Sequence, residues 1–548
     1  LTAQERRGLV LWECGLLGAA GSVLGLLGGW GLAVAALRLL SGDLGGGYFP
    51  GITPTVQWSG GGALLFGALG LLSALVGGWW PALAAQRLAP AQALKGLGLV
   101  DHRAPPAWPG LALLAAGAAL AFVPPLWGLP LAAYAAVALL LFGGVALVPA
   151  AVAALLSGRR KPRGALALLA VQRARFQRRT ATAAVAGVVA SLALSVALTV
   201  MVGSFRQGVA SWLDSILPAD LYARTATSGG SGDVVFLPEG FVAAAAQVPG
   251  VLKLQGSRTR PLSLAPGQPS VALVTRELSA PAEALPLLAN PLPARPGEVG
   301  VFVSEAVVAL YGVQTGALLN LPAGALRAQA VPVRVRGVWR DYARQFGAIA
   351  MDQADYQRLS GDTRLNDLAL WLQPGADIHA VQAGLRALLP SPELLEFAAT
   401  QELRVFSLRI FDRSFAVTYY LQAVAIAIGL VGIAASLSAQ VLARRKEFGL
   451  LAHLGLTRRQ VVAVVAGEGA AWMAAGTLVG LALGIAVSLV LVFVVNPQSF
   501  HWTMDLVLPW GRLAALCVAV MVAGTLTAAV TARSAAVRQA VLSVKEDW

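Results

Sequence analysis

The chain has 548 residues, of which 57% are hydrophobic and 12% charged, and its formal net charge is +14. A soluble domain carries roughly 25% charged residues, so this composition predicts an integral membrane protein with room for a soluble domain. The basic residues lie in short segments between apolar runs, which is the pattern of cytoplasmic loops and argues against a nucleic-acid partner.

Eight apolar segments are predicted to cross a bilayer, because each provides an apolar run between polar connections. They are residues 9–40, 60–80, 110–123, 129–156, 181–202, 415–441, 461–495 and 512–531. The basic connections then fall on one side of the membrane, and three loops without Lys or Arg fall on the other. This asymmetry predicts that the basic side and both ends of the chain are cytoplasmic.

Residues 205–414 differ from the rest, because their apolar runs are short and interrupted by Pro, Gly, Asp and Arg. We expect an extracytoplasmic α+β domain here. The predicted organisation therefore has five parts. They are residues 1–100 (two spans and a basic tail), 101–180 (a helix pair and a basic linker), 181–204 (a membrane helix), 205–414 (the external domain) and 415–548 (the last spans).

A basic elbow precedes the seventh predicted span. Apolar residues at helical spacing follow three basic ones, which predicts a short amphipathic helix over residues 442–456. Gly455 can adopt the left-handed conformation that ends this helix. Thr457 and Gln460 form the Thr-x-x-Gln pattern of a capping box, so Thr457 is predicted to start the next helix.

The elbow is partly repeated at the beginning of the chain, where Thr2 and Glu5 form a second capping-box pattern. An ungapped alignment of the two copies matches identical or similar residues over the helix that follows. The matched pairs are Leu1 with Leu456, Thr2 with Thr457, Glu13 with Glu468, Gly21 with Gly476, Ser22 with Thr477, Gly25 with Gly480, Leu26 with Leu481 and Gly29 with Gly484.

Few residues suggest catalysis. The sequence has no P-loop, no His-Glu-x-x-His and no Gly-x-Ser-x-Gly motif, and its four histidines are scattered, so no metal or cofactor is expected in this chain. Asp341, Tyr342, Arg344 and Gln345 form a polar run that we interpret as a solvated loop in preference to an active site. Glu13 and Glu468 are membrane carboxylates, for which a proton relay, a pairing with arginine or headgroups, and a shared coupling role stay open.

The elbow also has two interpretations. A basic juxtamembrane helix can bind anionic membrane lipids, which requires only positive charge. Docking of a cytoplasmic protein explains in addition why Glu447 lies within the basic run and why Gly449 and Gly455 interrupt it. We therefore favour docking.

Residues 444–460 resemble the signature of the FtsX-like permeases, the membrane subunits of MacB/LolC-type ABC transporters. Residues 301–306 and 311–316 are similar to the MacB-like core domain of that family, and residues 177–180 also fit. The resemblance implies two repeats with ten spans, of which this chain would lack the first helix and first external domain. It also implies that residues 1–100 end the first repeat, and that residues 442–456 are a coupling helix for a MacB/LolD-like ATPase dimer.

On that pattern, the ATPase contacts come from the elbow and the start of the next helix. The implied contact residues are Arg445, Lys446, Glu447, Gly449, Leu450, Leu454, Gly455 and Arg458. ATP and Mg would be bound by the partner chain, so the permease itself would be non-catalytic. A second permease copy or a periplasmic protein are further possible partners.

The resemblance implies a protein of the bacterial inner membrane that transmits ATP-driven motion to its external domain. The expected outcome is export or release of a lipoprotein, lipid or other amphiphile. Two alternatives remain: a mechanotransmitting regulator or sensor of envelope enzymes or kinases, and an integral membrane enzyme that modifies lipids. The enzyme would need clustered carboxylates or histidines, whereas the sequence offers only the separated Glu13 and Glu468.

Overall fold

The computed structural model describes residues 2–39, 56–87, 106–126, 128–156, 164–176, 178–225, 235–322, 331–389, 391–443 and 454–537. The chain divides into two compact units. One comprises Leu1–Pro105 with Ile410–Ala416, and the other Pro106–Arg409 with Val417–Trp548. Each unit is described by itself below.

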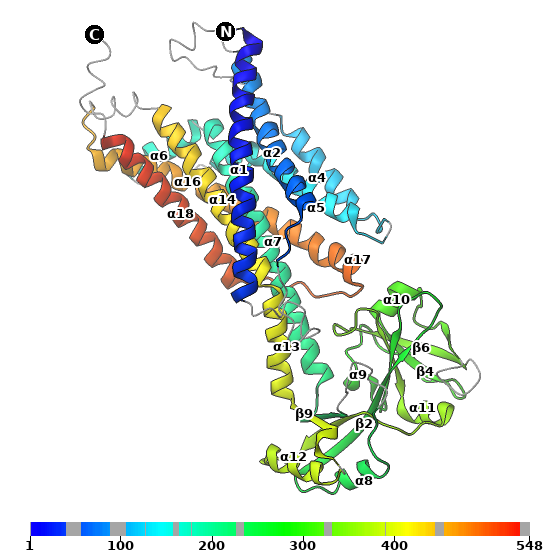
Figure 1. Cartoon of the computed structure of the whole chain (residues 1–548). Coiled ribbons are helices and arrows are strands. Elements are labelled where there is room, and N and C mark those ends of the chain that lie inside the picture. The colour runs from blue at the N-terminus through cyan, green and yellow to red at the C-terminus, as the bar shows by residue number, and fades with distance from the viewer. Residues whose placement is uncertain are drawn as a thin grey trace. The chain divides into compact units, whose positions relative to one another are not determined.

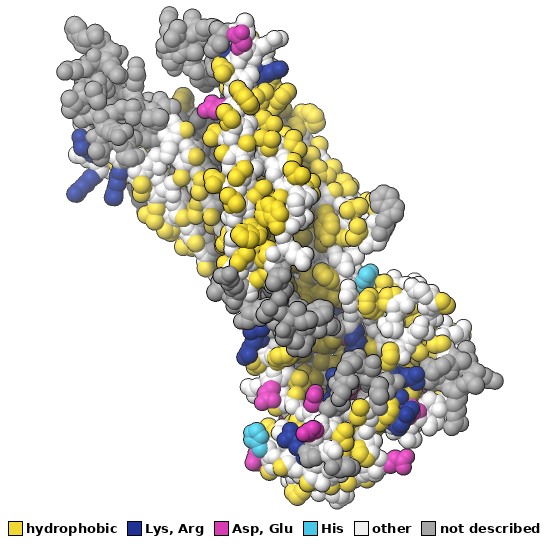
Figure 2. Space-filling view, viewed as in Figure 1, with side chains coloured by type: hydrophobic (Ala, Val, Ile, Leu, Met, Phe, Trp, Pro, Cys, Tyr) yellow, Lys and Arg dark blue, Asp and Glu magenta, His cyan; other side chains and the backbone are white. Residues whose placement is uncertain are grey.

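Most of the chain is helical (Figure 1), and within the described ranges seven helical segments are long and apolar enough to cross a membrane. The helices that form them are α1 (Ala3–Leu39), α2 (Gly60–Arg87), α5 (Leu131–Leu156), α7 (Arg178–Ile216), α13 (Thr400–Ser414) with α14 (Ala416–Ala443), α16 (Arg458–Val490) and α18 (Trp510–Val537). On the face seen in Figure 2, hydrophobic side chains cover these helices.

The third predicted span, residues 110–123, is the exception. It forms α4 (Trp108–Leu120), a helix of 13 residues. At 1.5 Å per residue this helix is about 20 Å long, which is too short for a hydrocarbon core of about 30 Å. The predicted fold class, a polytopic α-helical membrane protein with one α+β domain, is confirmed, but α4 does not meet the length of a full span.

Helix α16 is central to the larger unit. It packs against α5, α6 (Ala165–Phe176), α7 and α18. Its closest contacts to α7 use glycine: a Cβ on Gly484 would lie 2.6 Å from Cβ of Val196, and one on Gly480 would lie 3.2 Å from Cβ of Leu192. Glycine therefore allows the two helices to approach closely, as small residues do in membrane helix pairs.

Helix α16 ends in a π-helical turn, η2 (Leu491–Val495), and a short helix, α17 (Asn496–Phe500). Residues 501–509 then lead to α18. We call residues 496–509 the connector. His501 has a backbone φ of 62°, the left-handed conformation that a residue with a side chain seldom adopts.

The α/β domain contains a sheet of nine strands among the described residues, in the order β5-β6-β4-β7-β3-β2-β8-β1-β9. The strands are β1 (Leu221–Thr225), β2 (Val251–Leu262), β3 (Val271–Arg276), β4 (Gly300–Ser304), β5 (Leu318–Leu321), β6 (Val331–Trp339), β7 (Ala348–Asp352), β8 (Asp367–Leu372) and β9 (Leu395–Ala399). Pairs β3–β7 and β4–β6 are parallel and the other pairs are antiparallel.

Six short helical segments accompany the sheet within the residues that the structure describes. They are α8 (Phe241–Ala245), α9 (Pro281–Ala284), α10 (Glu305–Tyr311), α11 (Gln353–Ser360), α12 (Ile378–Ala387) and η1 (Pro392–Leu394). Two main hydrophobic cores result. One is formed by β3, β4, β6 and β7 with α10 and α11, and the other by β1, β8 and β9 with α8 and α12. The long strand β2 pairs with both β3 and β8 and so joins the two halves.

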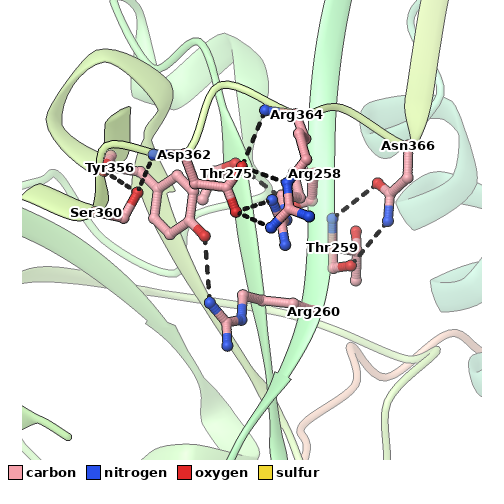
Figure 3. Close-up of polar contacts among 9 residues, drawn as sticks. All are labelled: Arg258, Thr259, Arg260, Thr275, Tyr356, Ser360, Asp362, Arg364 and Asn366. Atoms are coloured by element: carbon pink, nitrogen blue, oxygen red, sulfur yellow. Dashed lines mark hydrogen bonds and ion pairs between the residues drawn. The ribbon is translucent and has the colours of Figure 1, made fainter. Parts of the chain in front are cut away.

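A polar network attaches the loop before β8 to β2 (Figure 3). Arg258 of β2 is only 2% exposed and pairs with Asp362, to which Arg364 also donates at 2.9 Å. The hydrogen bonds from Arg364 hold the pKa of Asp362 far below its usual range despite partial burial. The side-chain amide of Asn366 bonds the backbone of Thr259 on both sides, at 3.0 and 3.1 Å. These bonds satisfy polar groups at the join of the sheet, which is a structural role.

Candidate functional site

Of residues 442–456, the structure describes 442–443, which end α14, and 454–456; α16 begins directly afterwards at Arg458. The Thr457 hydroxyl accepts a hydrogen bond from the Gln460 backbone N–H at 3.3 Å, and the Thr457 N–H donates to the Gln460 side chain at 2.8 Å. This is a complete capping box. Gly455 has a φ of 93°, so the chain turns there in the left-handed conformation.

The cap leaves three of the predicted ATPase-contact residues accessible, and Gly455 is one of them. Leu454 is 70% exposed and Arg458, the first residue of α16, is also exposed. The remaining predicted contacts of the elbow lie outside the described residues, together with the rest of residues 444–453. They are Arg445, Lys446, Glu447, Gly449 and Leu450.

Glu468 lies further along α16 than the cap, and its side chain is buried. It is 2% exposed, and Nε of Arg173 on α6 lies 3.5 Å from its carboxylate. Next to this pair, the indole N–H of Trp472 donates to the carbonyl of Ala174 at 3.3 Å. A buried carboxylate is stable when it is paired, so this ion pair and the indole bond fasten α6 to α16.

The first copy of the repeat has the same cap in a different setting. The Thr2 N–H donates to the Glu5 carboxylate at 2.7 Å, and the Glu5 N–H donates to the Thr2 hydroxyl at 3.3 Å. Glu13, the equivalent of Glu468, is exposed and forms no ion pair with any residue that the structure describes. The two membrane carboxylates therefore have different surroundings.

A second group of contacts joins the connector to the α/β domain, and we call it the junction. The Glu305 carboxylate accepts hydrogen bonds from the Thr503 hydroxyl at 2.6 Å and from its N–H at 3.1 Å. Arg340 donates to Asp505 at 3.1 Å, and the Tyr342 hydroxyl donates to the Thr503 carbonyl at 3.0 Å. Three residues of the domain thus bind the connector directly.

Helix α7 completes the junction. The Phe205 and Tyr342 rings lie on Trp502, with centroids 5.0 and 4.8 Å away. The indole N–H of Trp212 donates to the Arg340 carbonyl at 3.0 Å. Aromatic pairs at such distances contribute about 0.5–1.5 kcal/mol beyond their buried area. The junction is therefore a packed interface of α7, the connector and the domain.

Burial shifts two titrating groups of the junction. It raises the pKa of Glu305 above its ordinary value, although both hydrogen bonds from Thr503 act in the opposite direction. Burial also raises the pKa of Tyr342 to about 12, so its hydroxyl stays protonated and remains a donor at neutral pH.

The junction corrects one interpretation made from the sequence. We expected a solvated loop at Asp341 and Tyr342, but Asp341 is 3% exposed and bonds Arg344 at 3.0 Å, while Tyr342 packs in the junction. Gln345 is exposed, as in a solvated loop. The connector residues that Tyr342 meets are more than a hundred residues away in the chain, so local composition could not identify them.

In the part of the chain that the structure describes, no three His, Cys, Asp or Glu side chains gather in a way that could hold a metal ion. The contacts described above are hydrogen bonds, ion pairs and helix packing. These contacts can transmit force between elements, and they link both ends of α16 to other structures.

Fold and site together define a polytopic membrane protein whose long helices contact a mixed α/β domain. Residues 421–539 match the model of the FtsX-like permease C-terminal family. The resemblance seen in the elbow is thereby confirmed for this part of the chain.

Comparison with known proteins gives two further matches. Over 335 residues, 59% of this chain, the sequence is 30% identical to an uncharacterised ABC transporter permease protein of Mycobacterium tuberculosis. The matched part covers 38% of that relative's length. The extracellular domain of the noncanonic ABC-type transporter YknZ from Gram-positive bacteria is 13% identical and has a TM-score of 0.25. That match covers 32% of this chain and 98% of that one.

Proposed function

We propose that this chain is the permease part of an ABC transporter, which couples ATP hydrolysis by a separate cytoplasmic ATPase to movement of the α/β domain. The observation that supports this most directly is the path of α16. It begins at the capped elbow, and its C-terminal end continues through η2 and α17 into the connector that binds Glu305, Arg340 and Tyr342. A displacement of the elbow along or across α16 would therefore reach the domain.

Helix α7 provides a parallel path. It packs on the glycine face of α16 and reaches the junction through Phe205 and Trp212. Because helices in close backbone contact cannot slide without breaking that packing, α7 and α16 would move together. The ion pair between Arg173 and the buried Glu468 would add α6 to the same moving group.

In this proposal the elbow docks on an ATPase dimer of the MacB/LolD type, and ATP and Mg are bound there. The positions of the basic connections favour an elbow in the cytoplasm and an α/β domain outside it. The chain would sit in the bacterial inner membrane as a non-catalytic subunit. Its membrane helices contain few polar residues that could line a hydrophilic path, which favours force transmission over passage of a solute through a pore.

The proposed outcome is the extraction or release of an amphiphile, such as a lipoprotein or lipid, by the moving domain. A regulator of envelope enzymes or kinases would use the same path from elbow to junction, and it is the second candidate function because the junction suits either task. A lipid-modifying enzyme has less support, since Glu468 is paired with Arg173.

The test is co-purification of the permease with its ATPase, followed by ATPase assays in proteoliposomes. We expect the double variant Glu447→Ala with Gly449→Ala to lose the ATPase, whereas Glu239→Ala, an exposed change in the α/β domain, should retain it. Tyr342→Phe with Asp505→Ala should keep the ATPase bound but alter its response to the permease, because only the junction is weakened. Unchanged co-purification of the elbow variant would refute the docking role.

A further inference from the structure

A cavity of about 440 Å³ lies between the connector and the α/β domain. One wall consists of β6, α10 and the segment before β4, and the other of α17 and the three residues that follow it. Most of the lining is apolar and includes Leu288, Val308 and Trp502, and its polar residues include Glu305, His501 and Thr503. A mostly apolar cavity of this size with a few converging polar groups is typical of small-molecule sites.

The charge of the cavity is one-sided. Glu305 contributes a carboxylate to the lining, which contains no Lys or Arg among the described residues. The guanidinium of Arg340 is close, with Nε 3.8 Å from Glu305, but Arg340 donates its hydrogen bonds to Asp505 and Thr503. Asp505 lies outside the lining and shares Arg340 with Glu305. The described lining itself has one carboxylate and no Lys or Arg, so its polar end favours a cation.

Glu305 retains capacity to bind a further donor. An ionised carboxylate offers about four acceptor positions. The Thr503 hydroxyl and N–H occupy one position on each oxygen. Burial raises the pKa of Glu305, and an ammonium group bound beside the carboxylate would act in the opposite direction, as Arg340 does.

We propose that this cavity binds a cationic amphiphile, with its alkyl or aromatic part against Leu288, Val308 and Trp502 and its ammonium group at Glu305. Both walls contribute to the site, so a bound ligand would bridge the connector and the α/β domain and stabilise the junction. The inference rests on the proposed function only for the expectation that this protein handles amphiphiles. Its test requires no ATPase, so the two can fail separately.

The test uses the full chain in nanodiscs and a bromoalkyl amine, since bromine quenches a tryptophan that it contacts. We expect saturable quenching of the emission, and Trp502→Phe should remove the saturable component. A bromoalkyl carboxylate of equal length should bind at least tenfold more weakly in the wild type. Glu305→Gln should abolish this preference for the amine.

The cavity can also be filled. Ala309→Trp, at an exposed position of α10 that lines the cavity, should weaken amine binding tenfold or more. Ala354→Trp makes the same change at an exposed position of α11 outside the lining and should leave binding unchanged. Equal quenching by both bromoalkyl compounds, or equal effects of the two tryptophan variants, would overturn the proposal even if ATPase docking is normal.

Discussion

Helices α1 and α16, which begin at the two copies of the repeat, each pack closely on a following helix, α2 and α18 respectively, and use different residues to do so. In the first copy a Cβ on Gly78 would lie 2.5 Å from Sγ of Cys14, and in the second a Cβ on Gly469 would lie 2.7 Å from Cβ of Ala528. Cys14 and Gly469 occupy equivalent positions in the repeat. The glycine is thus on the second helix of the first pair and on the first helix of the second pair, and the helices approach closely in both.

The opposite faces of α1 and α16 differ much more. On α16, Gly476, Gly480 and Gly484 are covered by α7. A Cβ on the equivalent Gly21, Gly25 or Gly29 of α1 would meet no described atom within 4 Å. The same contrast holds for the paired Glu468 and the exposed Glu13. One face of α1 or α16 therefore packs on α2 or α18, whereas among the described residues the other face is covered only in α16, where α7 packs on it.

The largest expected difference between the copies concerns the carboxylates. Glu468→Ala removes the buried carboxylate that pairs with the half-buried Arg173, and losing one member of such a pair costs about 3 kcal/mol. Glu13→Ala removes an exposed carboxylate and should change the free energy of unfolding little. Denaturation of the purified protein in mixed detergent micelles would measure both.

The double variant Glu468→Ala with Arg173→Leu is the control, because it removes both charges and should recover much of the loss. If Glu468→Ala and Glu13→Ala were equally mild, Glu468 would have no structural ion pair and the contrast between the copies would fail.

These carboxylates also illustrate what could be predicted from the sequence and what could not. The matched Glu13 and Glu468 were recognisable from the repeat, and pairing with an arginine was among the interpretations. The identity of the partner was not accessible, because Arg173 is almost three hundred residues away and lies in a segment with several equivalent basic residues. The capping threonines needed only local spacing, so sequence alone located them.

The junction, in contrast, could not be predicted from the sequence. Tyr342 and Arg340 were visible in a polar run, but their role depends on the connector, which the sequence describes only as a loop without Lys or Arg. Helix α7 likewise continues to Ile216, past the predicted end of its span at residue 202, because its last turns pack on Tyr342 and Arg340. Tertiary contacts set these features, and no periodicity within the segment encodes them.

A second prediction compares the glycine faces. Gly484→Leu should destabilise the protein by about 3 kcal/mol, because the new side chain would overlap Val196 and the Ala193 carbonyl on α7. Gly29→Leu should be neutral or slightly stabilising, since its face is open and glycine is a poor helix former. The denaturation assay applies again. A strong effect of Gly29→Leu would mean that another helix covers α1 in the membrane.

A third prediction tests whether the repeat interfaces are equivalent. Gly78→Ala should cost about 1–2 kcal/mol through overlap with Cys14. Adding Cys14→Gly creates the glycine and alanine pair that Gly469 and Ala528 form, so the double variant should regain most of the loss. Strictly additive effects of the two changes would show that the interface between α1 and α2 does not follow the geometry of α16 and α18.

The smallest expected effect concerns the two capping boxes, which are the feature that the copies share most closely. Thr457→Ala and Thr2→Ala each remove one hydrogen bond to a helix N-terminus and should cost about 1 kcal/mol. Because the geometry is the same, the two losses should agree, and Thr→Ser at either site should be close to neutral. If Thr457→Ala also reduced ATPase co-purification while Thr2→Ala did not, the cap of α16 would be needed to orient the elbow, and the two copies would differ in function although they share this geometry.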